Sequence, residues 1–227
     1  MSKKLILGLL AMMVLSASMA QAGTLSVVDL PATGTDDAID INSGKNYTHT
    51  FDFGLNAPVT INGVAFEQGP TATLSSVYTG TSSWGYGYTI DDTRRPMDVP
   101  VHAGNANVEA DGSSNGLLRD MIYHGGANHI SLGGEGSILI LSDLTSGTTY
   151  STRWYYRPWN VNDIRVITFK ADGESNGIFS DTIELSIDAG GAHYLDYTFT
   201  ADDTDVTLQF ITHNDNTSAH IYGLWTF

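Results

Sequence analysis

Apolar and polar residues alternate with a period of two along most of this chain after residue 22. Successive side chains of a β-strand point to opposite faces, so this period predicts half-buried strands. Gly, Asn, Asp and Ser cluster between nearly all of these segments and favour turns. The alternating segments are 24–30, 47–53, 58–66, 84–90, 137–141, 149–157, 164–171, 182–187, 194–200, 206–212 and 220–227. About ten or eleven strands separated by turns indicate an all-β fold, an antiparallel β-sandwich or jelly roll.

Two segments depart from this pattern. Apolar residues recur at helical spacing from Leu117 to Ile122, and the Gly125-Gly126 pair is a helix terminator, so we expect one short helix near 116–124. The polar stretch between Asp91 and Ser114 predicts a long loop, and its role cannot be assigned from the sequence.

The first 22 residues have the three-part pattern of a secretory leader. Lys3 and Lys4 precede an apolar run, and the small residues Ala20-Gln21-Ala22 form an A-x-A cleavage site. The apolar run is shorter than the roughly 20 residues that span a membrane, so we expect no stable membrane insertion after its removal. We therefore predict a signal peptide at 1–22, a single β-sandwich domain at 23–227, and a protein that is secreted, either extracellular or periplasmic.

The charge and cysteine content of the chain exclude several classes of partner and of chemistry. The formal net charge is −15, and removal of the two leader lysines leaves 8 basic and 25 acidic residues, a charge of −17. Nucleic acid and anionic membrane surfaces are poor partners for such a protein. The chain has no cysteine, which excludes disulfides, thiol catalysis and Cys-ligated metal sites.

Alternating aromatic residues suggest a first candidate binding surface. Trp84, Tyr86 and Tyr88 are separated by glycines, so a continuous strand places their three rings on one face. Such a row can stack against the apolar C–H faces of sugar rings. The alternative interpretation is that the rings pack inside the sandwich core.

The segment 149–157 contains a second candidate. Strand alternation places Trp154 on the core face and sends Arg153, Tyr155 and Arg157 to the other face, with Trp159 just beyond. Arginine and tyrosine can hydrogen-bond sugar hydroxyls or bind carboxylates. The alternative is that these arginines pair with acidic residues of neighbouring strands while the aromatic rings simply pack.

Clustered aspartates suggest a calcium site. Asp36, Asp37 and Asp40 precede a predicted strand, and Ca²⁺ prefers such oxygen-rich turns. We expect these three residues to be candidate ligands of a structural Ca²⁺. The alternative is that they are solvated turn formers.

Four further stretches carry a family resemblance that covers roughly Tyr47 to the C-terminus. They are Lys45 to His49 running into Phe51–Gly54, Val59–Phe66, Leu117–Tyr123, and Leu144–Tyr150 leading into Arg153–Trp159. These stretches resemble secreted planctomycete-type β-sandwich proteins associated with PEP-CTERM sorting. The resemblance implies a jelly roll similar to galactose-binding-like and carbohydrate-binding modules. The chain departs from that group because it has no Pro-Glu-Pro sorting segment, which leads us to expect release in place of anchoring.

These observations favour a secreted, lectin-like, non-catalytic module that binds polysaccharide or another glycan, with structural calcium. The residues expected to contact the ligand are Trp84, Tyr86, Tyr88, Arg153, Tyr155, Arg157 and Trp159. Two alternatives stay open. One is a polysaccharide lyase or glycoside hydrolase on the same fold, with Tyr155 beside an arginine as a lyase base. The other is a structural or adhesive cell-surface protein.

Overall fold

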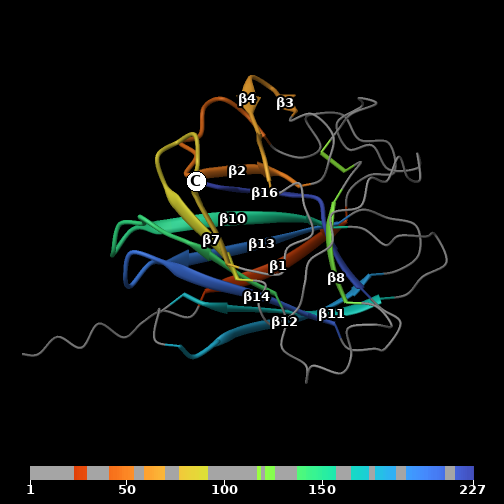
Figure 1. Ribbon diagram of the computed structural model, residues 1–227. Coiled ribbons are helices and arrows are strands. Elements are labelled where there is room, and N and C mark those ends of the chain that lie inside the picture. Colours follow the sequence, from red (N-terminus) through yellow and green to blue (C-terminus); the bar gives the residue numbers. More distant parts are fainter. Residues whose placement is uncertain are drawn as a thin grey trace, which may run out of the picture.

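Two six-stranded sheets form the body of the protein in the computed structural model (Figure 1). The structure describes residues 23–29, 41–53, 59–69, 77–91, 117–118, 121–125, 137–156, 165–173, 177–187, 193–212 and 218–227. The first sheet contains, in spatial order, β1 (Thr24–Asp29), β13 (His193–Thr200), β10 (Thr149–Tyr156), β16 (Gly223–Thr226), β2 (His49–Asp52) and β5 (Glu67–Gln68). The second contains β12 (Asp181–Ile187), β11 (Arg165–Asp172), β14 (Val206–Thr212), β9 (Ser137–Leu141), β7 (Gly87–Asp91) and β6 (Val77–Thr81).

Strand pairing in both sheets is antiparallel except between β2 and β5, which run parallel. Two small two-stranded sheets complete the described strands. They are β3 (Thr60–Ile61) with β4 (Val64–Ala65), and β8 (Ile122–Gly125) with β15 (Ser218–Ile221). The predicted all-β antiparallel sandwich is therefore confirmed.

The main core lies between the facing sides of the two sheets. Trp154 of β10 packs against Phe210 of β14, with ring centroids 4.9 Å apart, and Phe169 of β11 lies 5.1 Å from the same phenylalanine ring. Strand alternation explains the arrangement, since Trp154 is paired with Leu195 and both side chains join this core. We call this side of the first sheet its inner face.

The opposite side of the first sheet, its outer face, carries a second apolar cluster. Leu117, Leu118 and Met121 pack there on Tyr155 and Trp225, all of them buried. The other buried members of this outer cluster are Ile41, Tyr47, Ile61, Val64, Phe66 and Tyr222. The first sheet is thus covered on both sides over part of its area.

The helix predicted near 116–124 is wrong. Leu117 and Leu118 lie in a turn, and Ile122–Gly125 is strand β8, hydrogen-bonded to β15. The apolar spacing that suggested a helix serves two purposes here, because the leucines cover the outer cluster while Ile122 joins the main core. The part of the chain that the structure describes contains no helix of the length and apolarity needed to cross a membrane.

The predicted strand 58–66 is in fact a short hairpin. Asn62 and Gly63 both have positive φ, 48° and 81°, as a two-residue type I′ turn requires. The Asn-Gly pair between Ile61 and Val64 is a strong hairpin signal that strand periodicity alone overlooks.

Candidate functional site

Trp84 lies in the turn that joins β6 to β7, and its side chain is 42% exposed. The turn is closed by hydrogen bonds from Ser82 N to Tyr86 O at 2.6 Å and from Gly85 N to Ser82 O at 2.8 Å. Gly85 has φ +88°, a conformation that favours glycine. The indole Nε1 donates to Thr50 Oγ1 of β2 at 3.1 Å, which fixes the ring.

The same turn is fastened to the first sheet at two more points. Ser82 Oγ donates to the Thr48 carbonyl oxygen at 2.6 Å, and both the backbone N and the Oγ of Ser83 donate to Glu67 Oε2 at 3.0 Å. Trp84 therefore combines an exposed ring with a rigid support.

Aromatic rings continue from Trp84 across the outer face of the first sheet. The Tyr47 ring lies 5.8 Å from Trp84 and makes edge-on contacts with Trp225 at 6.1 Å and Phe227 at 6.4 Å. Lys45 Nζ lies 4.4 Å and 4.5 Å from the centroids of Trp225 and Phe227. These are cation–π distances, so the cation and the rings form one connected surface.

An ion pair continues this surface on the neighbouring strands. Arg153 Nε and Nη2 donate to the two carboxylate oxygens of Asp196 at 2.6 and 2.7 Å. The Arg153 guanidinium also lies 3.7 Å from the Tyr194 ring centroid and 5.0 Å from that of Trp225. Burial alone would lower the pKa of Arg153, but the hydrogen bond to Asp196 and the surrounding charges raise it above its usual value, so the guanidinium stays charged.

We name this connected surface the outer-face band. Its members are Lys45, Tyr47, Trp84, Arg153, Tyr194, Asp196, Trp225 and Phe227. Trp84 is its most exposed ring, and Tyr194, Phe227 and Lys45 are partly exposed. Tyr47, Trp225 and Arg153 are buried and support these exposed members from below. The band thus offers an apolar ring face beside polar groups at its edges.

The sequence-predicted aromatic row does not share one face. Tyr88 is buried in the main core, 4.6 Å from the Phe51 ring, and Tyr86 is half-buried, 5.9 Å from the His49 ring. The turn at Gly85 interrupts the alternation. Tyr86 and Tyr88 therefore pack at the main core, while Trp84 lies over the outer face of the first sheet. Only Trp84 of the three presents a broadly exposed ring.

The two described residues of the second candidate cluster, Arg153 and Tyr155, are also buried. Tyr155 is fully covered by the outer cluster, and its hydroxyl accepts a 2.9 Å hydrogen bond from Trp225 Nε1. Burial raises the pKa of Tyr155 well above its usual value. Arg153 makes the ion pair that our alternative interpretation expected. Because the Tyr155 side chain has no exposed surface in this structure, a polymeric substrate does not reach its hydroxyl here.

Several predicted residues lie outside the described part of the chain. These are Arg157 and Trp159 of the ligand set and the calcium candidates Asp36, Asp37 and Asp40. Within the described residues, no group of three or more His, Asp or Glu side chains is arranged to hold a metal ion.

Sequence reasoning missed Lys45, Tyr47, Tyr194, Trp225 and Phe227. Four of these belong to three predicted strands, but nothing in a single strand tells which of its faces will be covered. The pairing of Arg153 with both Asp196 and Trp225 brings these strands together. The alternation of Tyr194 and Asp196 in segment 194–200 was the available signal for an outward-facing row.

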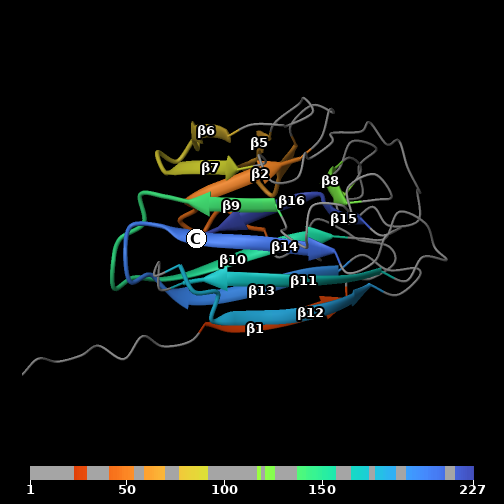
Figure 2. The same ribbon diagram turned by 60° about the horizontal axis from the view of Figure 1, so that its bottom comes forward.

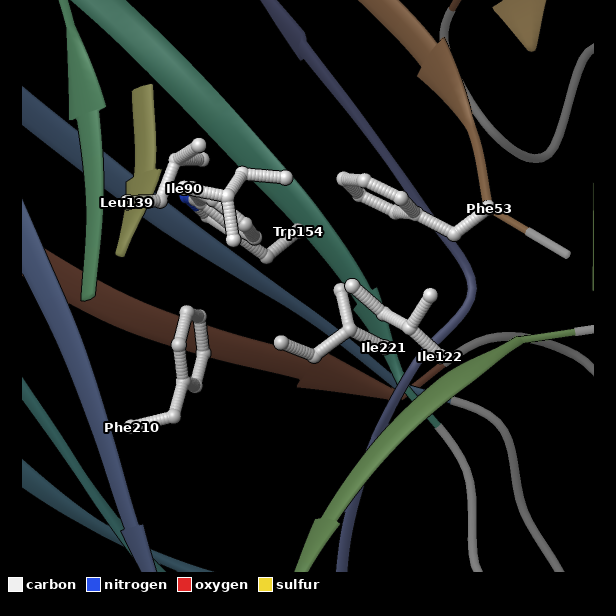
Figure 3. Close-up of a pocket in the computed structure, with 7 residues that line it drawn as sticks. All are labelled: Phe53, Ile90, Ile122, Leu139, Trp154, Phe210 and Ile221. Atoms are coloured by element: carbon white, nitrogen blue, oxygen red, sulfur yellow. The ribbon is translucent and has the colours of Figure 1, made fainter. Parts of the chain in front are cut away.

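A small hollow between the sheets is a different kind of site. It has a volume of about 10 Å³ and is lined by seven apolar side chains, which Figure 3 shows converging from both six-stranded sheets and from the paired strands β8 and β15. Trp154 Nε1, in this lining, has no hydrogen-bond partner among the described residues. A hollow of this size holds about one water molecule at most, so it cannot receive a sugar.

The geometry defines a β-sandwich domain with an aromatic and charged band on the outer face of one sheet. No known protein family matches the chain, and no curated protein matches it in sequence. Its fold is similar to that of the ANXUR1 extracellular domain from Arabidopsis thaliana, with a TM-score of 0.51 and 12% identity over 79% of this chain. The chain spans about half the length of that structure, 47%.

Two more distant structures are carbohydrate-binding modules. One is TmCBM61 in complex with β-1,4-galactotriose, with a TM-score of 0.34, 14% identity and coverage of 63% of this chain and 87% of that one. The other is a family 35 carbohydrate-binding module from Clostridium thermocellum, with a TM-score of 0.37, 10% identity and coverage of 67% and 98%.

Proposed function

We propose that this protein is an exported, non-catalytic glycan-binding module that holds a sugar ring against the exposed face of Trp84. The observation that carries the proposal is the fixed, exposed indole at the end of the outer-face band. An unsupported surface side chain loses rotamer freedom when it binds. The Nε1 hydrogen bond to Thr50 and the closed turn already hold the Trp84 ring in place in the folded protein. Binding a ligand therefore costs little further side-chain entropy at Trp84.

The surroundings of Trp84 suit an uncharged sugar. A pyranose stacks its C–H face on an indole and leaves its hydroxyls at the ring edge. Tyr47 is the ring next to Trp84, Phe227 and the cation Lys45 lie beyond it, and Asp196 already neutralises Arg153. The predicted mature charge of −17 repels polyuronates at long range. We therefore expect neutral glycans to bind better than acidic ones.

The test is glycan binding by the mature protein, first on an array and then by titration with a responsive oligosaccharide. Trp84→Ala should weaken binding by about 1–3 kcal/mol, the range for one stacked ring, and Trp84→Phe should lose less. Tyr78→Ala is the matched control, because Tyr78 is an exposed aromatic residue of the second sheet. Equal affinity of the Trp84→Ala variant and the unmodified protein would disprove the role of Trp84.

Two earlier expectations extend this proposal. Arg157 and Trp159 follow β10 in sequence and are proposed as further ligand contacts, which Trp159→Ala tests in the same titration. Asp36, Asp37 and Asp40 are proposed as ligands of a structural Ca²⁺, which repetition of the titration and of thermal unfolding with a chelator tests. Kinship with the PEP-CTERM-associated proteins stays a prediction.

A structural or adhesive role is the second candidate, because edge strand β1 exposes two valines. Val27 and Val28 are 40% and 39% exposed, and such an edge can pair with a strand of another molecule. This role predicts oligomers whose size grows with concentration in light scattering. A monomer at all concentrations would exclude it.

A further inference from the structure

Asp181, on edge strand β12 of the second sheet, is a buried carboxylate whose charge lacks a cation among the described residues. Its Oδ2 accepts hydrogen bonds from Tyr197 Oη at 2.7 Å and from Gly23 N at 2.9 Å. No described Lys, Arg or His forms an ion pair with it. A buried carboxylate is costly unless a positive charge or several hydrogen bonds offset its lost hydration. The described side chains therefore leave the charge of this carboxylate without a counter-cation.

Gly23, which contacts this carboxylate, is the first residue after the predicted A-x-A cleavage site. In the uncleaved chain its nitrogen is an amide with a single N–H. After cleavage the same nitrogen becomes an ammonium group with a positive charge and three N–H donors, 2.9 Å from Asp181 Oδ2.

We propose that removal of the predicted leader at the Ala22–Gly23 bond completes a site for the new N-terminus, in which the Gly23 ammonium group pairs with Asp181 and fastens β1 to the opposite sheet. The cleavage is an ordinary hydrolysis by a leader peptidase. The C–N bond between Ala22 and Gly23 breaks, water supplies the second oxygen of the Ala22 carboxylate, and its two hydrogens end on the Gly23 nitrogen. No oxidant or other reactant is needed.

The space around Gly23 is shaped for this residue. A Cβ atom at position 23 would lie 2.7 Å from Asp181 Oδ2 and would overlap the Tyr197 ring. That ring cannot move aside easily, because it stacks on Phe199 with centroids 4.9 Å apart. Any other residue at position 23 would push the nitrogen away from the carboxylate.

Strand β1 needs such an anchor because it buries little. Five of its six residues are exposed, and it pairs with β13 alone in its own sheet. Its far end is held by Asp29 Oδ1, 2.7 Å from His193 Nδ1. Its near end adjoins β12 of the other sheet (Figure 2). The Gly23–Asp181 pair thus joins the two sheets at their shared edge.

The experiment compares the mature protein that begins at Gly23 with the same protein extended by Ala22, each with Asp181 or with Asp181→Asn. Mass spectrometry of protein exported with its own leader first establishes the cleavage site. We expect the extension to lower Tm by on the order of 4 °C when Asp181 is present and by far less in the Asp181→Asn background. Asp29→Asn is the matched control, because it removes the carboxylate at the other end of β1, and there the full effect of the extension should persist.

A second measurement does not depend on the stability of any variant. The α-amine of the mature protein is treated near neutral pH with an amine-acylating reagent, with the lysines as internal references. We expect Gly23 to react at least about tenfold more slowly in the folded protein than in urea, since a paired ammonium is a poor nucleophile. Cleavage at another bond, an equal effect of the extension in both Asp181 backgrounds, or unprotected reactivity of Gly23 would each overturn the proposal.

Discussion

The two faces of the first sheet arise from the same strand alternation but differ in what covers them. The inner face carries Trp154, Tyr197 and Leu224 into a core that the second sheet closes. The outer face carries Arg153 and Trp225 from neighbouring strands, and it is covered at one end by the outer cluster and open at Trp84. The comparison teaches that alternation exposes an aromatic ring only where no second layer of chain covers it.

The largest expected effect is in the main core, where Phe169 of the second sheet packs against the inner face of the first. Phe169→Ala should lower the free energy of unfolding by about 3–5 kcal/mol, because Phe169 is fully buried against Trp154, Tyr197 and Phe210. Phe227→Ala, on the partly exposed band, should cost about 1 kcal/mol. Urea unfolding measures both. Similar losses for the two variants would show that the band is a second core.

The next effect concerns His49, a buried histidine on the inner face of β2. A backbone carbonyl only accepts, so Nε2 carries the proton and donates to the Gly87 oxygen at 2.9 Å. Burial lowers the pKa of His49 from 6.5 to about 4, although the Gly87 hydrogen bond and Asp143 act in the opposite direction.

This depressed pKa sets the direction of a pH effect. Between pH 6.5 and about 4 the unfolded chain binds a proton at His49 that the folded protein does not, so stability falls as the pH falls. Once the pH is below both the unfolded and the folded pKa of His49, this shift has lowered the free energy of unfolding by about 3 kcal/mol. His49→Gln should flatten this part of the curve of unfolding free energy against pH. An unchanged slope would assign the acid sensitivity to other groups.

A smaller effect is expected at the ion pair of the outer face. Asp196→Asn leaves the buried Arg153 guanidinium without its carboxylate, but the Asp196 side chain is 30% exposed, so solvent screens part of the loss. We expect a decrease of about 1–2 kcal/mol in unfolding free energy. Chemical denaturation tests this, with Asp203→Asn in an exposed turn as the control. A neutral or stabilising result would mean that the Arg153–Asp196 ion pair does not stabilise the folded protein.

A stability effect as small as that of Phe227→Ala is expected at Trp84. Trp84→Ala removes a half-exposed ring and one hydrogen bond to Thr50, which together are worth about 1 kcal/mol. The Tm should therefore change little, while the proposed glycan binding should weaken. If Trp84→Ala instead destabilised the protein as much as Phe169→Ala, the ring would be a structural element.

The sequence by itself determined the class of fold, because alternation with turn residues is a local property of the chain. Segments 149–157 and 194–200 needed no tertiary information to be recognised as strands. Strand alternation also predicted that the Trp154 side chain faces the core. Local signals also misled, since the apolar spacing near Leu117 fits a helix as well as a turn followed by a strand.

Only the tertiary structure decided which rings face water. Tyr155 and Trp84 are both aromatic residues of segments that the alternation predicts to be strands. Tyr155 is nevertheless buried in the outer cluster with the distant Leu117, whereas Trp84 is exposed. The ion pair of Arg153 with Asp196 and the meeting of Gly23 with Asp181 likewise join positions that are far apart in the chain. Sheet register and the packing of one layer on another set these contacts, and neither is encoded in the period of a single strand.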